Sequence, residues 1–386
     1  MPRRFPGLGV ERSGGPEFTN VEQFSTSGTH VWTPPSNITG RILVHVWGAG
    51  GAGGDQSEAL AYGHGGGGGG LAVKYIDVVS LGATETLTIG AGATSLTGIG
   101  GTSSFGSHCS ATGGNSGHNT TPNEGLTAYG CGGLGIGGDS NKRGGEGGNG
   151  VWGNATNNGG GGGGSAPAPY GRSDGYKGGD AVSTRSSGGG GGIGGEGGHS
   201  YQNMGAGGGG SAEGAQASYP NVDGSSPGGS GLLAPGGVPS SKSYTYVSHS
   251  HEPFAHAGES GSLKGGCKDS ILEPNMILFG GGGGSGSFVY VQSSGHNLSH
   301  ATSGGPGGGG GGMSSIGAIN ARQAQAGDGG ILGGGGGAGQ TNWAGRGGNA
   351  GGGGGAGYNA GALANHANQY YGYGGDGLII IQYKIK

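Results

Sequence analysis

Apolar residues are concentrated in short stretches towards the two ends of the chain. Three of these stretches lie at 41–48, 71–79 and 84–90. Within them apolar residues alternate with polar ones, and β-branched and aromatic side chains are frequent, which predicts strands. Further strands are expected at 24–35, which two prolines end, and at 287–293, and a weaker strand signal occurs at 103–106. No window shows the periodicity of an amphipathic helix, so we expect almost no α-helix.

The last apolar stretch, 377–384, contains the consecutive residues Ile379, Ile380 and Ile381. A strand without alternation is buried on both of its faces. The stretches 41–48 and 377–384 are the most apolar of the chain, and we therefore expect them to pair. Such a pair would hold together the two ends of everything that lies between them.

Glycine fills the region between these strands, since 115 of the 386 residues are glycine. Three interpretations compete: a flexible linker, a collagen-like helix, and a bundle of polyglycine-II helices. Collagen needs a strict Gly-X-Y period, which is missing here, and the chain has only 15 prolines. The longest glycine runs are 159–164, 188–192, 207–210, 280–284, 307–312, 333–337 and 351–355.

The polyglycine-II interpretation has a physical basis. Such a helix has about three residues per turn, rises about 3.1 Å per residue and makes no internal hydrogen bonds, so every N–H and C=O points outward. Without side chains, neighbouring helices can approach closely and pair these groups, as buried backbone requires. Ordering glycine costs conformational entropy, about 1–2 kcal/mol per residue, so isolated runs would not fold and a packed bundle is expected.

Composition and charge exclude several classes of function. Only 10% of the residues are charged and the net charge is −4, which argues against a nucleic-acid-binding protein. Cys109, Cys131 and Cys267 have no metal-binding spacing, and we expect unreactive thiols. No apolar run is long enough for a transmembrane helix or placed as in a signal peptide. No nucleophile–base pair or nucleotide-binding loop stands out, so we expect neither enzymatic activity nor a cofactor.

Four segments together resemble one known family. They are HVWTPPSNITGRILVHVWGAGGAGG (30–54), GGLAVKYIDVVSLGATETLTIGAGA (69–93), GGTSSFGS (100–107) and GGDGLIIIQYK (374–384). Their strands, turns and order are similar to those of the glycine-rich C-terminal domains of bacteriophage tail fibres and adhesins. A similar combination occurs in the extracellular glycine-rich region of certain animal receptor kinases, but this chain has no kinase segment.

The resemblance implies a small antiparallel β-sandwich, formed by N- and C-terminal strands, that carries an inserted polyglycine-II bundle. We expect an N-terminal docking arm at 1–20, the sandwich at 21–110 plus 375–386, and the bundle with variable loops at 111–374. The implied function is that of a virion protein that is assembled in the host cytoplasm and presents loops to a host-surface receptor.

The partners that the resemblance implies are other tail-fibre, baseplate or virion proteins on the arm side and a bacterial surface glycan or outer-membrane protein on the loop side. It also implies a homo-oligomer, of which a trimer is the common form among fibres. Two other functions remain open: a virion decoration or fibre-forming protein without a receptor, and an ice-binding protein.

Tyrosine-rich segments between the glycine runs are the candidate receptor contacts. Tyrosine offers rigid amphipathic area, and neighbouring Ser and Asn offer adaptable hydrogen bonds. The alternative is that some of these rings pack against the bundle. The candidate residues are Tyr170, Tyr176, Tyr201, Tyr244, Tyr246, Tyr370, Tyr371 and Tyr373.

One histidine pair is a candidate metal site. His249 and His251 would point to the same side of a strand. In a three-fold fibre, three such pairs would supply six nitrogens to an axial ion. The alternative, which we favour, is that these are solvated histidines of a loop.

Overall fold

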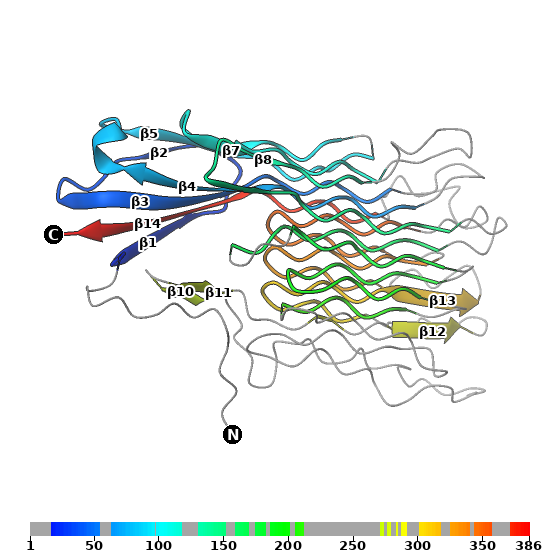
Figure 1. Ribbon diagram of the computed structural model, residues 1–386. Coiled ribbons are helices and arrows are strands. Elements are labelled where there is room, and N and C mark those ends of the chain that lie inside the picture. The colour runs from blue at the N-terminus through cyan, green and yellow to red at the C-terminus, as the bar shows by residue number, and fades with distance from the viewer. Residues whose placement is uncertain are drawn as a thin grey trace, which may run out of the picture.

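A computed structural model of the chain shows a mainly β architecture in which a sandwich is joined to a bundle of extended glycine-rich segments (Figure 1). Among the described residues the helical content is one 3-10 turn, η1 (Val78–Ser80), and none of their helices could cross a membrane. The structure describes residues 17–54, 63–96, 98–117, 130–151, 159–169, 174–182, 186–200, 205–211, 271–273, 276–278, 283–284, 287–291, 301–317, 325–339, 343–356 and 371–386.

Two five-stranded antiparallel sheets form the sandwich. The first sheet has the spatial order β1 (Asn20–Phe24), β14 (Leu378–Ile385), β3 (Ile38–Trp47), β4 (Leu71–Asp77) and β9 (Ser140–Lys142). The second has the order β2 (Gly28–Trp32), β5 (Glu85–Ile89), β6 (Ser103–Phe105), β7 (Cys109–Ala111) and β8 (Gly135–Ile136).

The pairing of β3 with β14 confirms the expected closure of the two apolar ends. Ile381 lies opposite Val44 and Leu378 opposite Trp47, in antiparallel register. Ile379, Ile380 and Ile381 are all fully buried, as predicted for a strand that is covered on both faces. The sandwich also takes β8 and β9 from residues 135–142, a range that the sequence assigned to the bundle.

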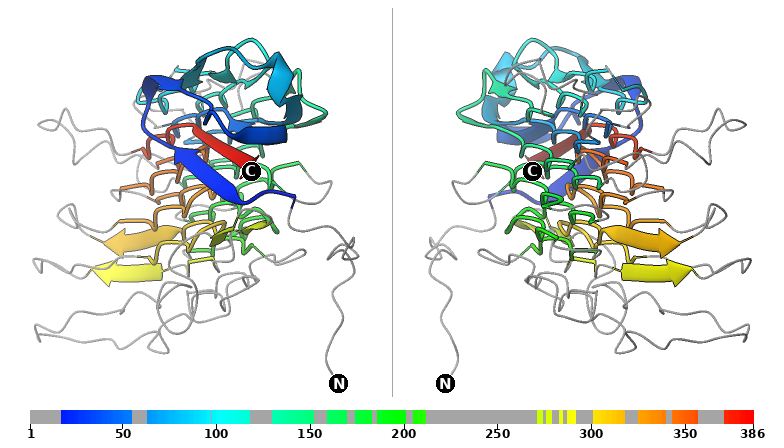
Figure 2. Two further views of the ribbon diagram at one scale, coloured as in Figure 1. Left: turned by 90° about the vertical axis from the view of Figure 1, so that its left-hand side faces the viewer. Right: turned by 90° about the vertical axis from the view of Figure 1, so that its right-hand side faces the viewer.

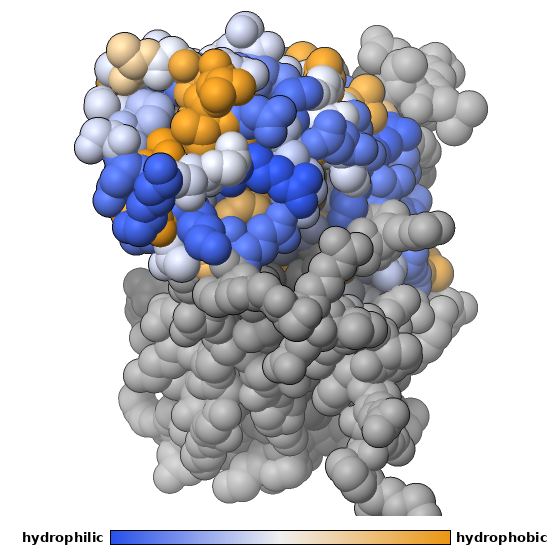
Figure 3. Space-filling model, turned by 60° about the vertical axis from the view of Figure 1, so that its left-hand side comes forward, coloured by the Kyte–Doolittle hydropathy of each residue, from blue (hydrophilic) through white to orange (hydrophobic). Residues whose placement is uncertain are grey.

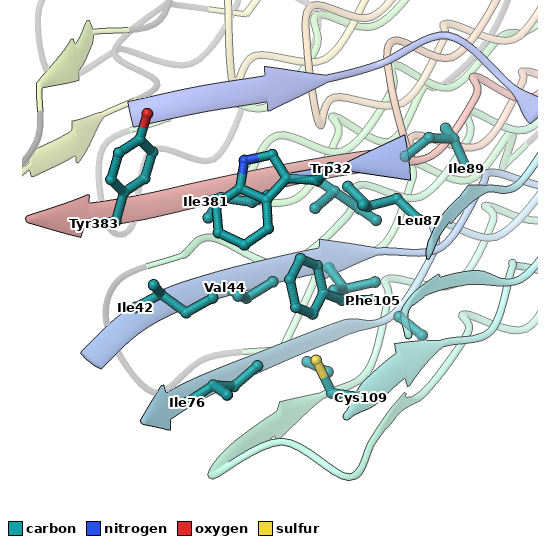
Figure 4. Packing of buried hydrophobic residues seen from close by; sticks show 14 residues of the cluster. Trp32, Ile42, Val44, Ile76, Leu87, Ile89, Phe105, Cys109, Ile381 and Tyr383 are labelled. Atoms are coloured by element: carbon teal, nitrogen blue, oxygen red, sulfur yellow. The ribbon is translucent and has the colours of Figure 1, made fainter. Parts of the chain in front are cut away.

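Alternating residues of the two sheets meet in the sandwich core (Figure 4). Trp32 of β2 packs against the rings of Phe105 and Tyr383, with ring centroids 5.8 and 6.0 Å away. The other members of this core are Ile42, Val44, Val46, Ala72, Ile76, Leu87, Ile89, Cys109, Ala111, Ile379 and Ile381. This core holds together the strands from which the glycine-rich segments depart.

A second apolar cluster joins the sandwich to the bundle. Trp47, Leu378 and Ile380, from the opposite face of the first sheet, pack with Ala166 and other residues of the bundle. The Trp47 indole is fully buried, and its Nε1 donates to the Pro167 carbonyl at 2.9 Å. Strands β3 and β14 therefore pack against the sandwich core with one face and against the bundle with the other.

The extended segments of the bundle, which we call rods, run side by side (Figure 2). Rod 159–166 shows their geometry through its N–H groups. Gly161 and Gly164 donate to Gly63 and Gly66 of one neighbour, both at 2.9 Å. Successive residues donate to different neighbours, and every third residue returns to the same one, which is the geometry of a polyglycine-II helix.

The other N–H groups and the carbonyls of rod 159–166 complete a ring of neighbours. Gly162 and Ser165 donate to the rod 174–182, and Gly163 and Ala166 donate to the rod 331–339. The carbonyls accept from three further rods, at 144–151, 186–193 and 351–356. This rod is thus hydrogen-bonded to six others, and the polyglycine-II interpretation is confirmed.

Glycine is required in the interior because the rods lie in backbone-to-backbone contact. A Cβ added at Gly163 would collide with the carbonyl group of Gly352, and one at Gly335 would collide with that of Gly345. Two short strand pairs complete the described structure. β10 (Ile271–Glu273) and β11 (Met276–Leu278) pair in antiparallel fashion beside β1, and β12 (Ser287–Val291) and β13 (Met313–Gly317) pair in parallel.

Candidate recognition surface

Many rods end at the side of the bundle that faces away from the sandwich, which we call the distal end. There Gly54 donates to the His64 carbonyl at 2.7 Å, and Ala356 donates to the Gly54 carbonyl at 2.9 Å. Gly54 and Gly63 flank the undescribed residues 55–62, and Ala356 precedes the undescribed residues 357–370. The chain therefore leaves and re-enters the described bundle repeatedly at this end.

Other rods end beside the sandwich. Pro169 precedes residues 170–173, and the adjacent Ala168 belongs to the cluster around Trp47. Ser211 precedes residues 212–270, and its neighbour Gly210 accepts from Gly194, next to Ile193 of the same cluster. These two segments are attached to the sandwich end of the bundle rather than to its distal end.

The candidate residues fall into these groups. The segments that contain Tyr201 and Tyr370 leave from the distal end, after Ser200 and Ala356. Tyr170, Tyr244 and Tyr246 belong to segments that leave beside the sandwich. These five tyrosines and the candidate metal ligands His249 and His251 lie outside the described residues. Tyr176, Tyr371 and Tyr373 are described.

The Tyr371 ring is buried against the bundle and is not exposed at its surface. Its side chain is 5% exposed and lies among Ala52, Ala93 and other alanines of the bundle, while its hydroxyl donates to the Thr94 carbonyl at 3.1 Å. The alternative of a ring packed against the bundle therefore describes this residue, and we leave it out of the recognition proposal below. Tyr176 is half-buried, and its backbone N–H donates to Ser165 Oγ at 2.8 Å.

Tyr373 lies at the edge of the bundle, in a T-shaped contact with Tyr371 at 6.0 Å between ring centroids. The guanidinium of Arg346, on the next rod, lies 5.4 Å from the Tyr373 centroid. Such cation–π contacts stabilise by about 0.5–1 kcal/mol at exposed sites. Arg346 and the exposed Trp343 were not among the residues singled out for recognition, although the spacing Trp343-Ala-Gly-Arg346-Gly-Gly-Asn349 marks a rod with one outward side.

Outward residues recur at every third position on the two flanks of the bundle, which appear on opposite sides in Figure 2. At a flank, no further rod supplies carbonyl acceptors for the backbone N–H groups that point outward. Polar side chains of the adjacent rod accept hydrogen bonds from these N–H groups instead. Asp174 Oδ1 accepts from Arg143 N at 2.9 Å, and Asp180 Oδ1 accepts from Asn149 N at 2.6 Å. Polar side chains thus complete the hydrogen bonding at the bundle edge.

Asp180 is the most strongly held of these carboxylates. Burial alone would raise its pKa, but hydrogen bonds from His199, from the Asn149 N–H and from Lys177 lower it to about 2. Lys177 Nζ lies 2.8 Å from Asp180 Oδ1, a pair at spacing i,i+3 that shares one face of a helix with three residues per turn. The charge of Asp180 therefore stabilises the folded bundle.

His199 can form a hydrogen bond with Asp180 in two ways. Its Nδ1 is 2.9 Å from the Asp180 backbone N and 3.3 Å from Oδ2 of the same residue. Neutral His199 accepts the N–H, whereas protonated His199 donates to the carboxylate. The hydrogen bond with Asp180 raises the pKa of His199 despite the opposing effect of burial.

Two other histidines are buried in neutral form. His64 Nδ1 accepts from the Gly150 N–H at 3.1 Å, and burial lowers the His64 pKa to about 4. His45 stacks on Trp47, with ring centroids 5.7 Å apart, and burial together with the nearby Lys142 charge lowers its pKa to about 3. Both residues belong to the packing of the fold.

No group of three metal-ligating side chains occurs in the described part of the chain. Cys109 is buried in the sandwich core, and burial raises the pKa of its thiol to about 11, so it is a poor nucleophile at neutral pH. The described surfaces thus offer flat arrays of polar and aromatic side chains, which suit binding by many small contacts.

The model of one protein family, described as a glycine-rich domain, matches residues 25–246, which is more than half of the chain. Comparison with curated proteins gave no match. The matched range begins between β1 and β2 and extends through the first rods of the bundle.

Proposed function

The chain belongs to this glycine-rich domain family, and we propose that it is a bacteriophage tail-fibre or tail-tip adhesin whose bundle presents receptor-binding segments at its distal end. The observation that carries the proposal is the polarity of the molecule. Thr19 donates to the Tyr383 carbonyl at 2.9 Å and Lys386 to the Asn37 carbonyl at 3.0 Å, at the tip of the sandwich. The distal rod ends lie at the opposite pole (Figure 1).

This polarity supports a division of labour between the two poles. The sandwich tip would attach the protein to another virion component, together with the docking arm expected at residues 1–20, of which residues 19 and 20 already pair with β14 in the sandwich. Its surface carries hydrophobic areas among hydrophilic ones (Figure 3), and Val79 and Val31 are 94% and 65% exposed. A rigid bundle between the poles would hold the distal segments away from the virion, where copies in a homo-oligomer would add their weak contacts.

The composition of the distal segments supports recognition of a bacterial surface glycan or outer-membrane protein. Residues 357–370, with the sequence GYNAGALANHANQY, combine Tyr, Asn and His, a composition suited to adaptable binding. The outward positions of the flanks include Glu146, Lys177 and Asp180, which are charged. They do not form the uniform row of small residues that an ice-binding face would need.

Replacement of the distal segment tests the proposal. Residues 357–370 would be exchanged for a Gly/Ser segment of equal length, and binding of the labelled protein to host bacteria would be measured. We expect binding to fall at least about tenfold, because weak contacts at several segments add up. The control exchanges residues 170–173, which contain the candidate Tyr170 but are attached beside the sandwich; if recognition lies at the distal end, this exchange should leave binding unchanged.

A chain that binds host cells equally well after the distal exchange would contradict the proposal. Loss of binding in the control as well would point to the whole bundle surface instead of its distal end. If the unaltered protein assembles into virions but binds no host cell, the alternative of a decoration or fibre-forming protein without a receptor is favoured.

A further inference from the structure

One flank of the bundle, which we call the Trp343 flank, places aromatic and hydrogen-bonding side chains in a flat array. It consists of Gln325 and Asp328 on one rod, Trp343 and Arg346 on the next, and Tyr373 on a third. Backbone hydrogen bonds fix the alignment: Gly329 N donates to the Arg346 carbonyl at 2.8 Å, and Gly347 N donates to the Tyr373 carbonyl at 2.9 Å. Asp328, Arg346 and Tyr373 therefore lie in one row across the rods.

A second row, one helical turn away, contains Gln325 and Trp343. Ala326 N donates to the Trp343 carbonyl at 2.8 Å, and Gln325 and Trp343 form a parallel bridge. Since three residues rise about 9 Å in a polyglycine-II helix, Trp343 and Arg346 are separated by about that distance along the rod. The indole is 40% exposed, a large value for a side chain of this size.

The polar members of the array are held in place. Asp328 Oδ1 accepts from the Arg346 backbone N–H at 2.7 Å, and Ser303 Oγ accepts from the Asp328 N–H at 3.2 Å. The Arg346 guanidinium lies over Tyr373, 5.4 Å from its centroid. A carboxylate has about four lone-pair sites and a guanidinium five N–H donors, so both retain capacity for a ligand.

The chemistry of this array favours a sugar. A pyranose has a face of C–H groups that stacks on an aromatic ring and a rim of hydroxyls that both donate and accept hydrogen bonds. A stable protein interface would need a larger apolar core than a single indole surrounded by polar residues. A nucleic acid would be repelled by Asp328, which lies in the same row as the cation Arg346.

We propose that the Trp343 flank binds a pyranose residue of a surface polysaccharide, with the sugar stacked on Trp343 and its hydroxyls bonded to Gln325, Asp328 and Arg346. The inference rests on the proposed function and deepens it, because it names the receptor as a glycan and assigns part of the binding to the side of the bundle. A flat flank cannot enclose its ligand, so an extended polysaccharide chain is favoured over a small free sugar.

The test uses the full chain on an array of purified bacterial surface polysaccharides, both capsular and lipopolysaccharide-derived. Trp343→Ala should weaken binding to the recognised glycan at least about tenfold, as removal of an anchoring aromatic side chain does. Trp343→Phe should restore part of the affinity, and Arg346→Met should weaken it. The matched control is Val182→Ala, at another exposed apolar side chain, which is 48% exposed on the rod 174–182.

Folding of the variants is not expected to fail, because the Trp343 Cβ is already accommodated and alanine adds nothing; an unchanged melting temperature checks this. Equal binding by Trp343→Ala and the unaltered chain would overturn the proposal, as would binding to no glycan on the array. A change of oligomeric state in Trp343→Ala, seen by light scattering, would instead assign the flank to contacts between copies and would also overturn it.

The result is distinguishable from the outcome of the distal exchange. A protein that binds host cells through residues 357–370, yet recognises no polysaccharide, would support the adhesin function and contradict the glycan site. A protein that loses glycan binding only in the Trp343 variant would support the glycan site whichever way the distal exchange turns out.

Discussion

At the scale of single residues, the bundle depends on the absence of side chains. Gly163 donates to Gly335 and its carbonyl accepts from Gly191, at 2.8 and 2.9 Å. Its missing Cβ would occupy the place of the Gly352 carbonyl group. Glycine is therefore selected here for contact distance, since no positive φ is recorded at this position.

We predict that Gly163→Ala destabilises the protein by about 1–3 kcal/mol or more, because the neighbouring rods must move apart. Thermal or denaturant unfolding measures this change. The control is Gly82→Ala, outside the bundle, where the new Cβ would lie 3.1 Å from the Thr84 carbonyl oxygen. The control should change stability by less than about 1 kcal/mol, and equal effects at the two sites would contradict close contact between the rods.

A second prediction concerns the carboxylate of Asp180. Because its folded-state pKa is lowered to about 2 from 3.8, its contribution to stability is complete above about pH 4 and is lost as the pH falls towards 2. Asp180→Ala should lower stability at pH 7 by about 1–3 kcal/mol, since the Asn149 N–H and Lys177 lose their partner.

Unfolding measured between pH 2 and pH 7 tests this. The variant should show a weaker dependence on pH between 4 and 2 than the unaltered chain. The control is Glu196→Gln, on the neighbouring rod, for which little change is expected. A pH dependence that is identical in the Asp180 variant and the unaltered chain would show that the carboxylate does not stabilise the bundle.

At the scale of elements, two kinds of rod can be distinguished by their sequence. Rods surrounded by six others are continuous glycine, as at 159–164, 333–337 and 351–355. Rods on the flanks place another residue at every third position, as in Arg143-Gly-Gly-Glu146-Gly-Gly-Asn149. The difference follows from the geometry, because only one of the three directions of a flank rod points away from its neighbours.

Hydrogen exchange should separate interior amides from turn amides. The N–H groups of Gly163 and Gly335 each donate to another rod inside the bundle, whereas that of Gly98 donates to the Ser95 carbonyl within a short turn. We expect the first two to exchange with deuterium far more slowly than the third, because their exposure requires the bundle to open. Fast exchange at Gly163 and Gly335, measured by NMR, would contradict the lateral hydrogen bonds.

Most of the sandwich could be predicted from the sequence, and the order of the rods could not. Alternation and β-branched residues revealed β3, β4 and β5, whereas β9 is a polar triplet, Ser140–Lys142, without an apolar pattern. Glycine runs specify that rods form but carry no side chains that choose partners. The identity of the six neighbours of rod 159–166 therefore had to come from the structure.

At the scale of the whole molecule, the sequence suggested which residue types would recognise a partner but not where they lie. Tyr371 follows a segment whose composition is typical of recognition loops, yet its ring is buried against alanines of the bundle. Trp343, which has no tyrosine-rich segment beside it, is exposed on a flank. Burial is decided by which rods become neighbours, and that choice is not encoded locally.

Because each turn of a rod contains three residues, the positions that point outward recur every three residues along the sequence. An insertion of one residue in a flank rod such as 174–182 would rotate the rest of that rod by a third of a turn. The side chain of Lys177 or Asp180 would then point into the interior of the bundle. An insertion of three would only lengthen the rod by one turn. We therefore expect relatives of this chain to vary freely in length between rods, and within rods only in steps of three.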